Sequence, residues 1–348
     1  MIQKIAKQSS VIGLDIGRES IKVAQLTLND KRPRLDGVVS LDRTSIGHSL
    51  SKSEAERLSC VMDRKGMGAT RAVLIAPTDA LVGGSVSVPP ADSKVSRDKI
   101  VEMELSRTHR LTPGSFELAW WDLPVPASGS RIGQAHAVGL PHGAVESTLQ
   151  AIAEVGLHVV RTVPTSLALL AAAQRHPIDP RQICAVLDLA STRGHLSLMY
   201  AGRVVHERDL PDFNLTAVRD AFVNALAIDN KIAKHAMQRF GLSSEPDGMV
   251  ACETNSVLGE ALEPLAEEIG LSYAYVSHLY PEAELGQMLL AGGGANISGI
   301  NSALSSVLEL ETAVIRPDSL MNGDSFSQQS HDPALSAAVG AAICGEGY

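Results

Sequence analysis

Two aspartates lie at the ends of apolar runs in similar surroundings. Asp15 follows the apolar residues 11–14 and Asp188 follows the apolar residues 185–187, and in each case a turn of small residues leads into a second apolar run. Each pattern predicts a β-hairpin whose turn presents backbone N–H groups to an anion. A carboxylate there suits Mg²⁺, because this ion prefers oxygen ligands and keeps several waters. The repetition predicts a duplicated fold with a ligand between its halves.

A glycine-rich turn is the third candidate for chemistry. It follows an apolar run and precedes a predicted helix, and it consists of Gly292, Gly293 and Gly294 with Asn296 close behind. A backbone without side chains can lie flat against a base or a ribose, and a helix start attracts phosphate. Plainer interpretations stay open, namely an ordinary hairpin turn for the first motif and a surface linker for the glycines.

The surrounding sequence predicts the elements that would position these residues. Residues 51–62 form a predicted helix, in which Ser51 and Glu54 fit a capping box. Residues 71–76 are apolar and β-branched enough for a buried strand, and 215–280 read as mainly helical. The sequence therefore predicts a sheet beside the first hairpin and a helical unit after the second.

These three motifs, in this order and at this spacing, resemble those of the actin-like ATPase superfamily, with two phosphate-binding hairpins and a later adenosine loop. Within it, the chain is similar to the PilM family of pilus-assembly proteins, relatives of the division protein FtsA. The resemblance covers nearly the whole chain and is carried by residues 14–17, 20–23, 73–77, 87–89, 156–160 and 164–170. It implies an α/β, two-lobed actin-like ATPase fold of duplicated ribonuclease H-like domains with an inserted small α+β subdomain.

The length of 348 residues suits about two domains, as this fold requires. Within residues 79–163, predicted strands and helices alternate as in a small α+β module. The implied divisions are the first lobe (1A) at 1–78, 164–180 and 331–348, the inserted 1C-like subdomain at 79–163, the second lobe (2A) at 181–212 and 286–330, and the helical subdomain (2B) at 213–285.

The resemblance also implies a nucleotide site that takes ATP and Mg²⁺. Asp15 and Asp188 are the residues expected near the metal. The residues expected to contact the cofactor are Asp15, Ile16, Gly17, Arg18, Glu19, Ser20 and Lys22 in the first hairpin, Asp188 and Ser191 in the second, and Gly292, Gly293, Gly294 and Asn296 in the glycine loop.

Three departures from the family pattern fall around this site. The second hairpin has Ala190 and Gly194 where the family places Gly and a hydroxyl residue. Residues 212–214 replace a Gly–Gly pair and bring an aspartate close to the expected polyphosphate. Lys234 and Met237 stand where an acid and a base are expected near the ribose and adenine.

Together the departures predict weakened nucleotide handling. Phosphoryl transfer depends on positioning and charge stabilisation, so we expect ATP hydrolysis to be very slow or absent, and no catalytic residue is assigned. Because Ala is disfavoured where φ is positive, Ala190 is expected to reshape the second turn. In the alternative, Ser191 or Thr192 supplies the missing hydroxyl from a shifted turn.

Composition limits the classes of partner. The net charge of −9 with scattered basic residues argues against nucleic acid. The cysteines, which lie far apart without a CxxC pair, favour buried reduced thiols over a zinc site or a disulfide framework, and they are Cys60, Cys184, Cys252 and Cys344. No run approaches the roughly 20 apolar residues of a membrane span, and no signal peptide is recognisable, so we expect a cytoplasmic protein.

The leading functional hypothesis comes from the resemblance. It implies a cytoplasmic component of a type IV pilus or type II secretion-like assembly at the inner face of the inner membrane. There it would bind the N-terminal cytoplasmic peptide of a PilN-like bitopic inner-membrane protein, in a groove between the first lobe and the inserted module. It would reach the membrane through partners only, and a homo-oligomer is compatible with this role. The alternative is an actin-like-fold ATPase or a small-molecule kinase, although no catalytic Asp with a kinase motif is recognisable.

Overall fold

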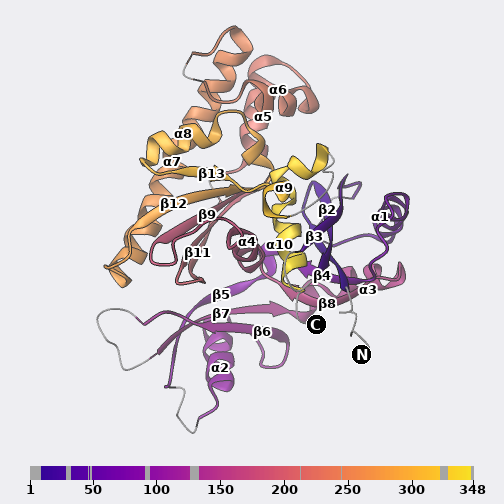
Figure 1. Ribbon diagram of the computed structural model, residues 1–348, viewed down its shortest axis with the longest axis vertical. Helices are drawn as coiled ribbons and strands as arrows, with labels where there is room; N and C mark the ends of the chain where they lie inside the picture. Colours follow the sequence, from indigo (N-terminus) through magenta and orange to yellow (C-terminus); the bar gives the residue numbers. More distant parts are fainter. Residues whose placement is uncertain are drawn as a thin grey trace, which may run out of the picture.

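The computed structural model describes residues 9–28, 33–45, 47, 49–90, 95–125, 133–211, 213–243, 245–321 and 328–345. They form two five-stranded sheets and a third sheet of three strands. In Figure 1 the two larger sheets lie on either side of the central helices α4 (Thr165–Ala173) and α10 (Ser336–Ile343). The two-lobed α/β architecture expected from the sequence is confirmed.

The sheet of the first lobe has the strand order β3-β2-β1-β4-β8. In chain order its strands are β1 (Ser9–Ile16), β2 (Ser20–Leu28), β3 (Arg34–Asp42), β4 (Arg71–Ile75) and β8 (His158–Val163). Successive side chains of a strand point to opposite faces. Val11 accordingly packs with the central helices, whereas Ile12 and Leu14 pack with the helices α1 (Lys52–Arg64) and α3 (Glu146–Glu154). Because both faces are covered, residues 11–14 of β1 are apolar.

The central helix α10 approaches β1 closely, and a glycine makes this approach possible. A Cβ atom at Gly13 would lie 1.8 Å from the carbonyl oxygen of Ala338. A second glycine, Gly340, brings α10 against α4, since a Cβ there would lie 1.9 Å from the carbonyl oxygen of Ala168. The same buried cluster contains Val186 of the second lobe, so the two lobes share one core beneath the cleft.

The sheet of the second lobe repeats the first, with the order β11-β10-β9-β12-β13. Its strands are β9 (Ile183–Leu189), β10 (Gly194–Tyr200), β11 (Arg203–Leu210), β12 (Leu285–Ala291) and β13 (Thr312–Val314). In each sheet the first three strands of the lobe are antiparallel and the later two run parallel to the first. The duplication predicted from the two hairpins is therefore present.

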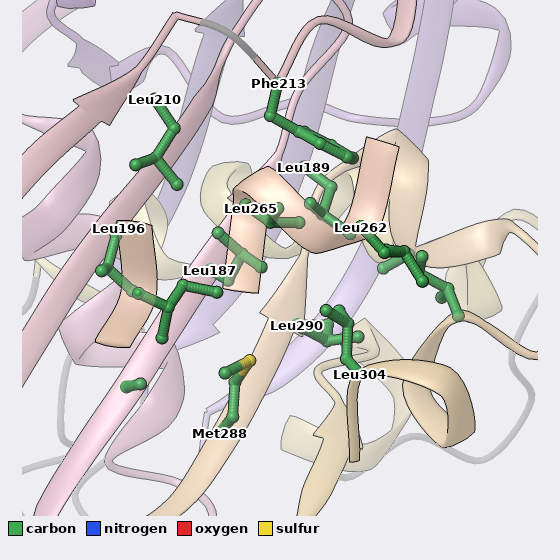
Figure 2. Packing of buried hydrophobic residues seen from close by; sticks show 14 of the residues in the cluster. Leu187, Leu189, Leu196, Leu210, Phe213, Leu262, Leu265, Met288, Leu290 and Leu304 are labelled. Atoms are coloured by element: carbon green, nitrogen blue, oxygen red, sulfur yellow. The ribbon is translucent and has the colours of Figure 1, made fainter. Parts of the chain in front are cut away.

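Helices cover the second sheet, and those that lie within residues 215–280 form the predicted helical unit. The covering helices are α5 (Leu215–Leu226), α6 (Asn230–Phe240), α7 (Met249–Leu279) and α8 (Ile300–Leu308). Figure 2 shows the sheet residues Leu187 and Leu290 in one packed cluster with Leu262 and Leu265 of α7. None of the described helices, including the 31-residue α7, has both the length and the apolar character required to cross a bilayer.

The inserted module is a three-stranded antiparallel sheet of order β5-β7-β6, covered by α2 (Arg97–His109). Its strands are β5 (Val82–Val88), β6 (Phe116–Asp122) and β7 (Gly133–Pro141). It also contacts the second lobe, because the indole Nε1 of Trp121 donates to the carbonyl oxygen of Val204 at 2.8 Å. The remaining short elements are α9 (Pro317–Leu320), η1 (Thr78–Ala80), η2 (His142–Ala144), η3 (Gly293–Asn296), η4 (Gln328–His331) and η5 (Pro333–Leu335).

Two sequence expectations differ from the structure. The sequence predicts one inserted module over 79–163, but β8 pairs with β4 in the first sheet and α3 packs on that sheet. Two neighbouring parallel strands must be joined by a crossover connection, and α3 belongs to the connection between β4 and β8. The thiols were expected to be buried, yet Cys60 and Cys252 are exposed, while Cys184 is buried.

Candidate functional site

A pocket of about 270 Å³ lies between the lobes and gathers every residue of the predicted nucleotide site. It is lined by the turns of both hairpins, by the glycine loop and by parts of α5 and α6. The predicted residues that line it are Asp15, Ile16, Gly17, Arg18, Glu19, Ser20, Lys22, Asp188, Ser191, Gly292, Gly293, Gly294 and Asn296. Their convergence follows from the fold, and their part in binding a ligand stays a prediction.

The first hairpin places Lys22 directly opposite Asp15. The Nζ atom of Lys22 lies 2.8 Å from Asp15 Oδ2, and both side chains are largely shielded from solvent. Burial alone lowers the pKa of Lys22, but attraction to Asp15, with smaller contributions from Asp188 and Asp332, raises it above its ordinary value. The pocket therefore holds a charged ammonium group surrounded by carboxylates.

A buried ion pair behind the first turn fixes its shape. Arg43 Nε donates to Glu54 Oε1 at 2.8 Å, and Arg43 Nη1 donates to the carbonyl oxygen of Gly17 at 2.9 Å. Burial alone would raise the pKa of Glu54, but hydrogen bonds from Arg43, Ser45 and backbone N–H groups hold it well below its usual range. Glu54 also completes the capping box of α1 with Ser51, as predicted. The sequence signalled Glu54 as a helix cap, but nothing in it signalled that Arg43 reaches the turn.

The second hairpin has the same register with different chemistry. Asp188 stands opposite His195, whose Nδ1 lies 2.9 Å from Oδ1 of Asp209 on β11. Burial raises the pKa of Asp188 to about 6, against the opposing attraction of Lys22. Asp188 is thus a shielded carboxyl group that lines the pocket.

The residues that depart from the family pattern in this hairpin behave differently from expectation. Ala190 lines the pocket but is not among the residues with positive φ, so alanine is not strained there. The expectation that Ala190 reshapes the turn through a positive φ is therefore wrong. Gly194 does not line the pocket, and a Cβ on it would lie 3.3 Å from that of Leu210.

The other departures divide between the pocket wall and its surroundings. Lys234 and Met237 both line the pocket, Lys234 as an exposed residue and Met237 as a buried one. Asn214 instead caps α5, since its side chain accepts hydrogen bonds from the backbone N–H groups of Thr216 and Ala217. Asp212 lies outside the described residues.

Two glycines of the loop pack so closely on their surroundings that they exclude side chains, whereas a Cβ at Gly293 would meet nothing within 4 Å. At Gly292, where φ is 81°, a Cβ would lie 2.2 Å from Asp188 Oδ1. At Gly294 a Cβ would lie 2.6 Å from Leu215 Cδ1. Asn296 Nδ2 donates to Asp332 Oδ1 at 2.6 Å, and Asp332 was not predicted as a site residue. The only sequence signal for Asp332 is the following proline and helix, a pattern typical of a helix start.

Ion pairs occupy most of the basic side chains around the pocket. Four of its lining cations pair with carboxylates, in the pairs Arg18–Asp79, Lys22–Asp15, Arg193–Asp209 and Arg219–Glu19. The last pair joins the first-lobe turn to α5 of the second lobe. An anionic ligand would therefore compete with carboxylates already present.

The residues fit a hydrated Mg²⁺ carried by a nucleotide better than a metal bound by protein alone. Within the described ranges there is no group of three or more His, Cys, Asp or Glu side chains arranged to hold a metal. Asp15 and Asp188 line the same pocket, and one or two carboxylates together with phosphates are the usual protein share of a Mg²⁺ site. These two carboxylates would hold the ion, which would neutralise phosphate charge.

A second cavity of about 450 Å³ lies where the inserted module meets both lobes. Its walls include Pro164–Ser166 of the first lobe and two strands at sheet edges, β5 and β11. His136 Nε2 of β7 lies 3.0 Å from Glu207 Oε1 of β11 across this space. Gly84 on β5 lines the cavity, and a Cβ there would meet nothing within 4 Å. The cavity is thus bordered by the outer strands of two sheets and by polar side chains.

Comparisons with known proteins agree on the family and the fold. The family described as "Type IV pilus assembly protein PilM" matches residues 13–345. A solved "PilM-PilN type IV pilus biogenesis complex" is similar with a TM-score of 0.79 and 19% identity, covering 96% of this chain and 98% of that chain. No curated protein sequence matches the chain.

More distant structures share the fold. A MamK double helical filament is similar with a TM-score of 0.53 and 12% identity, covering 98% of this chain and 99% of that one. MreB5 of Spiroplasma citri bound to ADP has a TM-score of 0.51 and 13% identity, covering 97% of this chain and 96% of that one. The fold is therefore that of the actin-like ATPases.

Proposed function

The chain belongs to the PilM family of type IV pilus assembly proteins, and we propose that it binds the cytoplasmic N-terminal segment of a PilN-like bitopic membrane protein. It would work at the inner face of the inner membrane, held there by that partner. The observation that carries this proposal is the family match over residues 13–345. The solved PilM–PilN complex has a similar fold and supports the same partner class.

The second cavity is our proposed groove for the partner segment. It lies between the first lobe and the inserted module, where the resemblance places the peptide, and it is lined by β5, an edge strand. An extended peptide can add to an exposed sheet edge through main-chain hydrogen bonds, while side chains in the groove select its sequence. Gly84 of β5 leaves room beside that edge, since a Cβ there would meet nothing within 4 Å.

Titration calorimetry with synthetic N-terminal peptides of candidate membrane partners tests the groove. Gly84→Phe should abolish binding, because the new ring would fill the groove. The protein itself can accept the substitution, since a Cβ at this position meets no atom within 4 Å. The matched control is Gly68→Phe, an equally open glycine that lines neither cavity. Equal binding by the two variants would contradict the groove assignment, and no binding by the unmodified protein to any such peptide would contradict the partner.

We further propose that the interlobe pocket binds ATP with Mg²⁺ and hydrolyses it very slowly. All predicted contact residues converge on it, and distant relatives of the same fold include a structure with bound ADP. Cations already paired with carboxylates, together with Met237 in place of a base, favour weak binding and poor positioning of phosphate. An active actin-like ATPase is the alternative, and phosphate release by the purified protein separates the two.

A further inference from the structure

A glutamate of the first-lobe turn reaches across the mouth of the interlobe pocket. Glu19 Oε1 lies 3.0 Å from the Arg219 guanidinium and 3.3 Å from Thr216 Oγ1, both on α5 of the second lobe. The same Thr216 hydroxyl lies 2.9 Å from the carbonyl oxygen of Ser191 in the second turn. The Glu19 carboxylate therefore links the turn of the first hairpin to α5, and Thr216 links α5 to the turn of the second, where its backbone N–H also donates to the carbonyl oxygen of Ser191 at 2.8 Å.

This carboxylate stands in a turn that is proposed to bind phosphate. Such turns act through backbone N–H groups, and a carboxylate among them repels the anion that they attract. The equivalent position in the second hairpin, counted from its aspartate, holds the neutral Thr192. The negative charge at Glu19 is thus specific to the first turn.

Arg219 has capacity for a second acceptor. Its side chain is only 17% exposed, and its Nε is buried with no hydrogen-bond partner among the described residues. A guanidinium group binds carboxylate and phosphate in the same forked geometry. An entering phosphate would therefore find in Arg219 a suitable partner that Glu19 already occupies.

We propose that Glu19 is an internal anion that clasps the two lobes in the absence of ligand and competes with a nucleotide phosphate for Arg219. The proposal rests on the proposed nucleotide pocket only for the competing ligand, because the clasp itself joins two protein groups. Loss of the Glu19 charge should loosen the lobes and strengthen nucleotide binding together. Substitution of a residue with a merely structural role would not increase the lobe separation and the nucleotide affinity together.

The native cysteines provide a way to measure lobe separation. Cys60 on α1 and Cys252 on α7 are exposed, one in each lobe. Burial raises the pKa of Cys184 to about 12 and that of Cys344 to about 11, so these thiols react slowly. Nitroxide labels on Cys60 and Cys252 therefore report the distance between the lobes by electron–electron double resonance, without engineered sites.

The test compares Glu19→Gln, which keeps the shape of the side chain, with Glu117→Gln, a surface glutamate of the inserted sheet whose side chain is 82% exposed. Without nucleotide, Glu19→Gln should broaden and lengthen the label distance, and the control should not. Arg219→Gln should give the same change, and the double variant no more than either. In calorimetry, Mg-ATP should bind Glu19→Gln about tenfold more tightly, equal to about 1.4 kcal/mol.

The outcomes separate this inference from the proposed nucleotide site. A lengthened distance in a protein that binds no nucleotide at millimolar concentration supports the clasp and removes the nucleotide proposal. Unchanged distances in Glu19→Gln overturn the clasp whether or not nucleotide binds. Nucleotide bound equally by the unmodified protein and Glu19→Gln overturns the competition, because the charge would then have no effect on the ligand.

Discussion

The β1–β2 and β9–β10 hairpins share a backbone plan but differ in how charge is arranged on it. Asp15 stands opposite Lys22 and Asp188 opposite His195, at the same separation along the chain. Lys22 pairs with Asp15 within the pocket, whereas His195 pairs with Asp209 outside it. A duplicated fold thus offers one hairpin in which the aspartate is ion-paired and another in which it is shielded, with its pKa raised to about 6.

The supports of the two turns differ as well. Behind the first turn, Arg43 and Glu54 form a pair whose side chains are 2% and 0% exposed. Beside the second turn, Arg193 and Asp209 form a pair with 37% and 35% exposed side chains. Because shielding decides how much one lost partner costs, the first turn depends on its ion pair far more than the second.

The largest effect should come from breaking the buried support. Glu54→Gln leaves the Arg43 guanidinium buried without its counter-charge, so the free energy of unfolding should fall by about 3–5 kcal/mol. Arg193→Gln, which breaks only the partly exposed pair beside the second turn, should cost about 1 kcal/mol or less. Urea unfolding of the two variants measures both values. Similar losses would show that the two turns are supported alike.

Nucleotide binding should distinguish the two hairpins next. Asp15→Ala removes the carboxylate expected near the metal, so it should weaken Mg-ATP binding by about tenfold or more, which is about 1.4 kcal/mol. Gly194→Thr should leave affinity unchanged because Gly194 does not line the pocket. Calorimetry with and without Mg²⁺ checks the assignment. If Asp15→Ala binds Mg-ATP as well as the unmodified protein, Asp15 has no part in the site.

The pH dependence of stability should have opposite signs in the two hairpins. The lowered pKa of Glu54 means that its stabilisation is complete above its unfolded value near 4.5 and is lost as the pH falls further. Burial alone lowers the pKa of His195, but Asp209, Glu207 and Asp188 raise it above 6.5 overall, so its contribution is complete below that value and is lost as the pH rises.

Comparison of the unmodified protein with His195→Gln isolates the second of these contributions. The unmodified protein should lose more stability than the variant as the pH rises above about 6.5, because the pKa of His195 is raised above that value in the folded state. Chemical unfolding at a series of pH values gives the difference directly. A difference that grows with acid instead would place the pKa of His195 below its ordinary value.

The sequence was sufficient for the fold because local signals agreed with one another. The apolar run before Asp15, the Ser51–Glu54 capping box and the triple glycine each predicted an element that the structure contains. The assignment of β8 failed for a physical reason: a strand of the sequence His158–Val163 looks the same whichever sheet it joins. Pairing partners depend on tertiary packing, which a pattern along the chain does not encode.

The site was predictable only as far as backbone motifs extend. Local sequence marks turns and glycines, so the residues of the pocket walls could be predicted. Side chains that cross between elements could not be predicted in this way. Arg43 reaches Gly17 from the end of another strand, and Arg219 reaches Glu19 from the other lobe. The orientation of His195 away from the pocket likewise depends on Asp209, a residue of the neighbouring strand.

The smallest effect is expected in hydrolysis. Positioning and charge stabilisation supply most of the catalysis of phosphoryl transfer, so a pocket whose cations are held by carboxylates should turn over far more slowly than about one per second. Asp188→Ala should then change the measured rate little, because the unmodified protein already has almost no turnover to lose. Steady-state phosphate release measures both proteins. Turnover near one per second that Asp188→Ala abolishes would mean that Ser191 or Thr192 replaces the missing hydroxyl, and that the second hairpin is as competent as the first.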